Sequence, residues 1–154
     1  MLIVLAPVAG TVRLLVDVPD PVFATAMVGP GVAIEPVDGV VVAPVTGVVV
    51  AAHPHAVAIR ADGESARDVL VHLGVDTVGL GGEGFALLVA AGERVEAGAP
   101  VVRWSPDAVR GAGLSALCPV VALQAGGGVR PLVGPGVEVA AGDPLLAWAG
   151  DPSD

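Results

Sequence analysis

The sequence predicts an all-β protein, an antiparallel sandwich or barrel with one or two short helical turns. Short apolar runs rich in Val alternate with 22 glycines and 14 prolines along the chain, a pattern typical of strands joined by turns. Two kinds of segment also occur twice, which indicates repeated β-units. With 154 residues, 54% of them hydrophobic, the chain can bury one ordinary core. We expect one domain over residues 1–150 and a short tail over 151–154.

The first repeat is a short strand module. Segment Ala6–Val12 reads APVAGTV, and segment Ala43–Val49 reads APVTGVV. Each has a proline and a glycine beside apolar residues, which indicates a turn followed by a strand. We therefore expect the same module at two places in the fold.

Helix is expected to be scarce, and two short helical turns have recognisable start and stop signals. Pro21 can open a turn over Val22–Met27, and Gly29 can close it. A second turn begins after Ser105, a favourable N-cap, with Pro106 at its first helical position. Glycines that follow closely limit the length of this second turn.

A β-hairpin is predicted after the second strand module. His55 begins the apolar run Ala56–Ile59. His72 ends the run Val69–Val71, and Ala61–Ser65 is expected to form the turn between the two runs. Residues that face each other in antiparallel strands lie about 5 Å apart. The hairpin therefore predicts that His55 and His72 share one site.

The second repeat lies in the C-terminal half of the chain. Gly92–Gly98 precedes Val101–Trp104, much as Gly136–Gly142 precedes Leu145–Trp148. Each unit reads as a turn, a short strand, a glycine turn and a second strand, so we expect two similar hairpins. A hairpin of this size cannot bury an apolar face alone, which favours closure of the units on one another.

Charge and cysteine content exclude several classes of function. A formal charge of −9 repels phosphate backbones and argues against nucleic acid as a partner. Cys118 is the single cysteine, so no internal disulfide can form, and we expect a small buried side chain in a reducing compartment. The apolar start of the chain runs into Pro7 and Gly10 too early for a signal peptide or a membrane span. We expect a soluble cytoplasmic protein without direct membrane insertion.

The histidines are the main candidates for chemistry. His53, His55 and His72 are the side chains whose ordinary titration falls near neutral pH. Two neutral imidazoles suit phosphoryl transfer, because one ring nitrogen can act as nucleophile while the other ring donates a hydrogen bond to the charged transition state. This scheme needs no metal and no other cofactor.

Residues 70–78, LVHLGVDTV, resemble the phosphorylation-site motif of glucose-class enzyme IIA components of bacterial sugar phosphotransferase systems. The resemblance continues in further stretches, namely Val18–Phe23, Met27–Ile34, Ala43–Gly47, Gly82–Phe85 and Cys118–Val121. It implies a fold of the duplicated-hybrid-motif type. The family usually has Thr-Asn-His-Ala where this chain has His53–Ala56.

The resemblance also implies roles for particular residues. His72 would be the phosphoacceptor charged by phospho-HPr, and His55 the second active-site histidine that steadies the phosphoryl group. The acceptor downstream would be a cysteine of an enzyme IIB domain, and regulatory proteins are further partners in the family. We expect a monomer whose partner-binding face includes Val22, Phe23, Val28, Leu70 and Val78, with the acidic residues Asp20 and Asp76 beside it.

The sequence also permits comparison with three other classes of function. A biotinyl or lipoyl carrier requires a lysine at a hairpin tip, and the sequence has no lysine. A zinc-dependent hydrolase of related fold could use a ligand set drawn from His53, His55, His72 and Asp76. A regulatory module without phosphoryl transfer is a third alternative, which the presence of both His55 and His72 disfavours. Glucose, N-acetylglucosamine and β-glucosides all remain open as the sugar.

Overall fold

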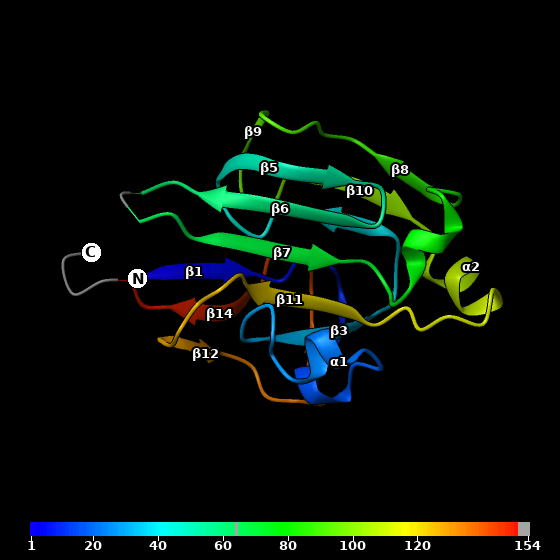
Figure 1. The fold of residues 1–154 in the computed structure, drawn as a ribbon, viewed down its shortest axis with the longest axis horizontal. Coiled ribbons are helices and arrows are strands. Elements are labelled where there is room, and N and C mark those ends of the chain that lie inside the picture. Colours follow the sequence, from blue (N-terminus) through cyan, green and yellow to red (C-terminus); the bar gives the residue numbers. More distant parts are fainter. Residues whose placement is uncertain (64, 151–154) are drawn as a thin grey trace.

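The computed structural model describes residues 1–63 and 65–150. Glu64, in the turn expected over Ala61–Ser65, and the tail expected over 151–154 lie outside the described residues. The described part is an antiparallel β-sandwich with two short α-helices, as the sequence predicted (Figure 1). None of its helices is long and apolar enough to cross a membrane.

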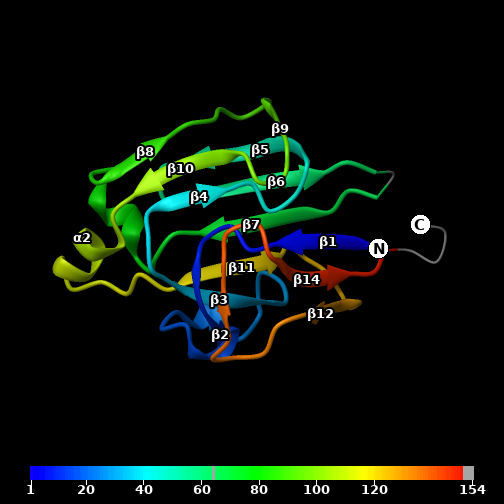
Figure 2. The ribbon, with the colours of Figure 1, turned by 180° about the vertical axis from the view of Figure 1, so that it is seen from behind.

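The largest sheet has eight antiparallel strands. Their order across the sheet is β13 (Glu138–Val139), β2 (Gly10–Leu14), β3 (Gly31–Pro36), β11 (Cys118–Ala122), β7 (Asp68–His72), β6 (Ala56–Ala61), β5 (Gly47–His53) and β9 (Arg94–Val95). Two sheets of three strands complete the sandwich (Figure 2). One consists of β1 (Leu2–Leu5), β14 (Pro144–Trp148) and β12 (Val129–Pro131), the other of β4 (Val40–Val42), β10 (Pro100–Trp104) and β8 (Phe85–Leu87).

The eight-stranded sheet has the same succession of strand types on either side of its centre. Strands β7 and β11 pair at the centre, and each is followed outward by a long strand, a module strand and a two-residue edge strand. Gly10 of the first module faces Val139, just as Gly47 of the second module faces Val95. The predicted double use of one strand module is therefore confirmed. The middle of the chain builds one half of the sheet, and strands from its N-terminal and C-terminal parts together build the equivalent other half.

The prediction of two C-terminal hairpins was wrong in its pairing. Strand β9 pairs with β5, whereas β10 belongs to another sheet and pairs with β4 and β8. The reason lies in the turn between them, whose backbone binds the strand module instead of closing a hairpin. Gly98 donates its N–H to the carbonyl of Ala43, and the N–H of Ala43 donates to the carbonyl of Ala99. The equivalent turn does the same, because Gly142 donates to Ala6.

Both predicted helical turns are present. Helix α1 (Pro21–Ala24) begins at Asp20, whose carboxylate accepts a hydrogen bond from the N–H of Val22 at 3.0 Å. Helix α2 (Pro106–Gly111) begins at Ser105, whose hydroxyl oxygen accepts from the N–H of Ala108 at 3.1 Å. Two 3-10 turns, η1 (Leu15–Asp17) and η2 (Thr77–Leu80), were not predicted.

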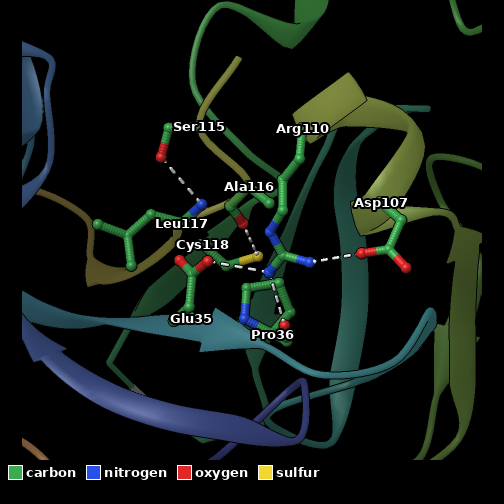
Figure 3. Close-up of polar contacts among 8 residues, drawn as sticks. All are labelled: Glu35, Pro36, Asp107, Arg110, Ser115, Ala116, Leu117 and Cys118. Atoms are coloured by element: carbon green, nitrogen blue, oxygen red, sulfur yellow. Dashed lines mark hydrogen bonds and ion pairs between the residues drawn. The ribbon is translucent and has the colours of Figure 1, made fainter. Parts of the chain in front are cut away.

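Helix α2 is attached to the large sheet through Arg110 (Figure 3). Its guanidinium donates to Glu35 at 2.9 Å and to the carbonyl of Pro36 at 2.8 Å, both in β3. It also donates to Asp107 on its own helix at 2.9 Å. The arginine therefore fixes a helix whose Val109 packs inward against the main core.

The apolar side chains form two clusters. The larger fills the space between the sheets and includes residues from nearly every strand. The smaller lies between α1 and the large sheet and consists of Leu15, Val18, Phe23, Ala33, Val75, Leu117 and Val121. Because Phe23 and Val75 flank the end of β7 that bears His72, the smaller cluster forms one wall of the site described next.

Candidate functional site

His72 and His55 are brought together by the hairpin of β6 and β7, as predicted. His72 is the last residue of β7 and faces Ala56, the first residue of β6. His55 lies in the turn immediately before β6, and its carbonyl accepts a hydrogen bond from the N–H of Leu73 at 2.8 Å. The two imidazole rings meet edge to face, with centroids 5.4 Å apart.

The ring of His72 is held by a backbone carbonyl. Its Nδ1 lies 2.6 Å from the carbonyl oxygen of Gly74. Because a carbonyl oxygen can only accept, Nδ1 carries the proton in this arrangement and Nε2 keeps its lone pair. The contact therefore selects the tautomer whose Nε2 is the nucleophilic nitrogen.

The loop that supplies this carbonyl requires a glycine at position 74. Gly74 has φ +78°, and a Cβ built on it would lie 2.7 Å from the methyl group of Thr77 and 2.8 Å from the carbonyl oxygen of Ser115. Only glycine suits this position without displacement of its neighbours. Thr77, a fully buried residue, donates its hydroxyl to the carbonyl of Leu73 at 2.7 Å. The loop is thus fixed on both sides of Gly74.

Four aromatic rings form a continuous row through the site. The Phe23 ring lies 5.2 Å from His72, His72 lies 5.4 Å from His55, and His55 lies 5.7 Å from His53. The His53 and His55 rings stack with an interplanar angle of 28°. The grouping of the three histidines was predicted, but two contacts of His72 were not. The contact with Phe23 requires a remote segment to pack against the sheet, and the contact with Gly74, two residues away, depends on the conformation of the loop.

Burial keeps both imidazoles of the pair neutral. The pKa of His72 is lowered from the ordinary value of 6.5, chiefly because burial disfavours the charged ring; the hydrogen bond to Gly74 and the carboxylates of Asp20 and Asp76 act in the opposite direction. The pKa of His55 is lowered by burial and then by the neighbouring His72 and His53. At neutral pH both rings are therefore uncharged, which a nucleophilic nitrogen requires.

The predicted partner-binding residues separate into a buried and an exposed group. Phe23 is 6% exposed and belongs to the smaller cluster, against which Val28 and Leu70 pack half-buried. Val22 and Val78 are 40% and 66% exposed, on the two segments that flank His72. Val16, in η1, and Met27, shortly after α1, are further exposed apolar side chains and were not predicted.

The two aspartates of the prediction lie beside the site in turns. Asp20 is the N-cap of α1, and Asp76 has φ 60° immediately before η2. Both carboxylates act on His72 by raising its pKa, against the effect of burial. Their negative charge therefore acts on the ring of His72, the predicted phosphoacceptor.

The ligand set of the zinc alternative does not form a metal site. His53, His55, His72 and Asp76 all lie within the described residues, among which no three His, Cys, Asp or Glu side chains are placed to hold one metal ion. The Nδ1 of His72 is committed to Gly74, and the rings of His53 and His55 stack face to face instead of converging.

Fold and site together define an antiparallel β-sandwich protein with a pair of neutral histidines at the end of a central strand. Residues 2–128 match the family described as phosphoenolpyruvate-dependent sugar phosphotransferase system, EIIA 1. The chain belongs to this family.

Individual relatives agree with this assignment. A glucose-specific EIIA component of Staphylococcus aureus is 39% identical over 75% of this chain and 70% of its own length. A glucose-specific EIIBCA component of Corynebacterium glutamicum is 43% identical over 78% of this chain, which spans only 18% of that relative. Among solved structures, glucose permease IIA from Mycoplasma capricolum has a TM-score of 0.84 and 36% identity, with 94% of each chain covered.

Proposed function

We propose that this chain carries a phosphoryl group between two partner proteins of a sugar phosphotransferase system, with His72 as the residue that is transiently phosphorylated. The observation that carries the proposal is the hydrogen bond between Nδ1 of His72 and the carbonyl of Gly74. It leaves Nε2 as the free nucleophilic nitrogen, on a ring that burial keeps neutral.

In the first step, Nε2 of His72 attacks the phosphorus of phospho-HPr. The nitrogen–phosphorus bond of the donor breaks as the new bond to Nε2 forms. The ring of His72 gains positive charge when Nε2 becomes bonded, and the carbonyl of Gly74 faces the Nδ1–H at 2.6 Å, where it stabilises that charge. The phosphoryl group itself is transferred with little other covalent chemistry, so positioning dominates the rate.

His55 supplies the electrostatic part of this positioning. Its ring lies 5.4 Å from that of His72 between centroids, in an edge-to-face arrangement. A neutral imidazole at this position has one N–H, which can donate to a phosphoryl oxygen as negative charge spreads over the transferring group. The residue takes no part in bond making, and so its loss should leave the acceptor nitrogen intact.

In the second step, a cysteine thiolate of an enzyme IIB domain attacks the phosphorus. The bond to Nε2 breaks, the sulfur–phosphorus bond forms, and His72 returns to its neutral state. Two relatives with 43% identity are named for different sugars, glucose and mannose. Phosphoryl transfer, rather than choice of sugar, is therefore the function that we assign to this chain.

The exposed apolar surface next to His72 suits transient docking. Val22 and Val78 are exposed, and the half-buried Val28 and Leu70 pack against the cluster that contains Phe23, the ring next to His72. Asp20 and Asp76 add negative charge to a chain of net charge −9, which favours partners with basic faces. Both partners need the same face in turn, and we therefore propose a monomer that acts in the cytoplasm.

The test is phosphorylation of the purified protein by enzyme I, HPr and labelled phosphoenolpyruvate. Wild type, His72→Ala and His55→Ala are compared for acid-labile label and for its passage to an enzyme IIB domain. We expect no label on His72→Ala, and label on His55→Ala that is passed on at least about 100-fold more slowly. Thermal unfolding of each variant controls for loss of fold, and absence of label on folded wild type with its cognate HPr would refute the proposal.

A further inference from the structure

The ring of His55 contacts two other imidazole rings. Within the described residues no hydrogen bond holds its imidazole, in contrast to His72, which is fixed by Gly74. Its two aromatic neighbours are His72, edge to face, and His53, stacked at 5.7 Å with an interplanar angle of 28°. Removal of either neighbour would free the ring to turn about its side-chain bonds.

The backbone around His53 fixes the position of its ring relative to the ring of His55. His53 is the last residue of β5 and faces Ala56, so only Pro54 and His55 form the turn between the strands. Pro54 has a fixed φ, and its ring packs against the backbone at Gly82, where a Cβ would lie 3.3 Å from the proline Cγ. Because the turn is anchored, the exposed ring of His53 is presented to His55 at a set distance.

We infer that His53 is a positioning residue, which holds the ring of His55 by stacking so that its N–H is directed at the phosphoryl group on His72. The inference rests on the function proposed above and adds a third histidine to it. His53 touches neither Nε2 of His72 nor the transferred group in this scheme. Its effect is confined to the fraction of time that His55 spends in the productive orientation.

The variants that test the inference are His53→Ala, which removes the ring, and His53→Phe, which keeps a ring that can stack but cannot hydrogen-bond or carry charge. His53→Val also removes the ring but keeps a side chain that favours strands. It therefore controls for destabilisation of the hairpin by alanine. Each protein is first phosphorylated to completion, and single-turnover transfer to an enzyme IIB domain is then measured.

We expect His53→Ala and His53→Val to transfer about threefold to tenfold more slowly than wild type, which is the range expected for loss of one aromatic contact. His53→Phe should restore the rate to within about twofold of wild type. All three variants should accept label from phospho-HPr to the wild-type level, because His72 and Gly74 are untouched. An unchanged rate in both ring-less variants would overturn the inference, and so would a His53→Phe rate as slow as that of His53→Ala.

A second readout does not depend on phosphoryl transfer. A ring stacked on His55 shifts the NMR signals of its carbon-bound ring protons upfield. This shift should be present in wild type and His53→Phe and lost in His53→Ala, and its persistence in His53→Ala would count against stacking. If the function proposed above were wrong, wild type would take no label while this NMR result stayed the same, so the two failures are distinguishable.

Discussion

His72 is a residue whose reactivity is set by its surroundings, and its pH dependence follows from them. Burial lowers the pKa of His72 below 6.5. We therefore predict that its rate of labelling by phospho-HPr falls to half of its maximum only below pH 6.5, because the ring then takes up a proton and Nε2 loses its lone pair. The measurement is an initial-rate profile with HPr phosphorylated in advance.

The control is the pH dependence of phosphoryl transfer from phospho-HPr to an unrelated acceptor, which shows any effect of protonation of HPr itself. A midpoint at or above 6.5 would contradict the prediction.

The lowered pKa values of His72 and His55 also affect stability, because the unfolded chain takes up protons on these histidines at a higher pH than the folded chain does. The free energy of unfolding should accordingly decrease as pH falls through 6.5 and the unfolded histidines become charged.

Thr77 is a second residue whose environment decides its energetic role. Its buried hydroxyl donates to the carbonyl of Leu73 at 2.7 Å, next to the loop that holds His72. Thr77→Val keeps the shape but leaves that carbonyl without its donor, so we expect a loss of about 1–3 kcal/mol in the free energy of unfolding. Urea denaturation measures it.

Thr25 offers a matched control for this prediction. Its hydroxyl makes the same kind of bond, to the carbonyl of Pro21 four residues earlier at 2.6 Å, but on the exposed surface of α1. Water can replace the donor there, and so Thr25→Val should cost less than about 1 kcal/mol. Equal losses in the two variants would mean that burial does not set the energy of the Thr77 bond.

At the scale of elements, Arg110 joins α2 to β3. It donates to Glu35, Asp107 and the carbonyl of Pro36 (Figure 3). We predict that Arg110→Met lowers the free energy of unfolding by about 1–2 kcal/mol, because it removes one partly buried backbone bond along with two exposed ion pairs. Thermal or urea unfolding is the measurement.

Arg60 provides the comparison, because within the described residues its guanidinium donates to a carboxylate and to no backbone carbonyl. It forms a two-pronged ion pair with Asp68 across the surface of β6 and β7, at 2.8 and 3.0 Å. Arg60→Met should therefore cost less than about 1 kcal/mol. A larger loss for Arg60→Met than for Arg110→Met would show that the bond to Pro36 does not contribute as argued.

The elements that could be predicted from sequence are those with local signals. Ser105 followed by Pro106 marks the start of α2, and the spacing of the apolar runs marks the hairpin that places His55 beside His72. Strand pairing after the glycine turns could not be predicted, since those turns bind Ala6 and Ala43, which are remote in sequence. The same holds for η2, which follows Asp76 in a left-handed conformation unusual for a residue with a side chain.

The site itself shows the same division. The proximity of the two histidines follows from antiparallel pairing of two apolar runs, which the turn between the runs indicates. The selection of the Nε2 tautomer does not, because it depends on the carbonyl of Gly74 in a loop stabilised by Thr77 and Ser115. The wall made by Phe23 likewise requires α1 to pack against the large sheet, which no local pattern of residues specifies.

At the scale of the whole molecule, Cys118 reports on global unfolding. It begins β11, beside the centre of the large sheet, and is fully buried, with its thiol donating to the carbonyl of Ala116 at 3.3 Å (Figure 3). Burial raises the pKa of the thiol to about 12. We predict that thiol reagents modify native protein only at the rate at which the fold opens, whereas protein in concentrated urea reacts at once.

Addition of a stabilising solute should slow the native reaction, because it disfavours opening of the fold, while the reaction of a small free thiol serves as the reagent control. Rapid modification of native protein, at the rate of that free thiol, would contradict the placement of Cys118 at the protected centre of the sheet.

The pairing of β1 with β14 has a consequence for how this domain can be tethered. Leu2 faces Trp148, so both ends of the sandwich chain leave from one place. The end of β7 that bears His72 points away from that place (Figure 1). A linker joined to either end of the domain would therefore be attached on the side opposite the histidines. Such a linker would leave the face that bears His72 free to contact a partner in the same polypeptide.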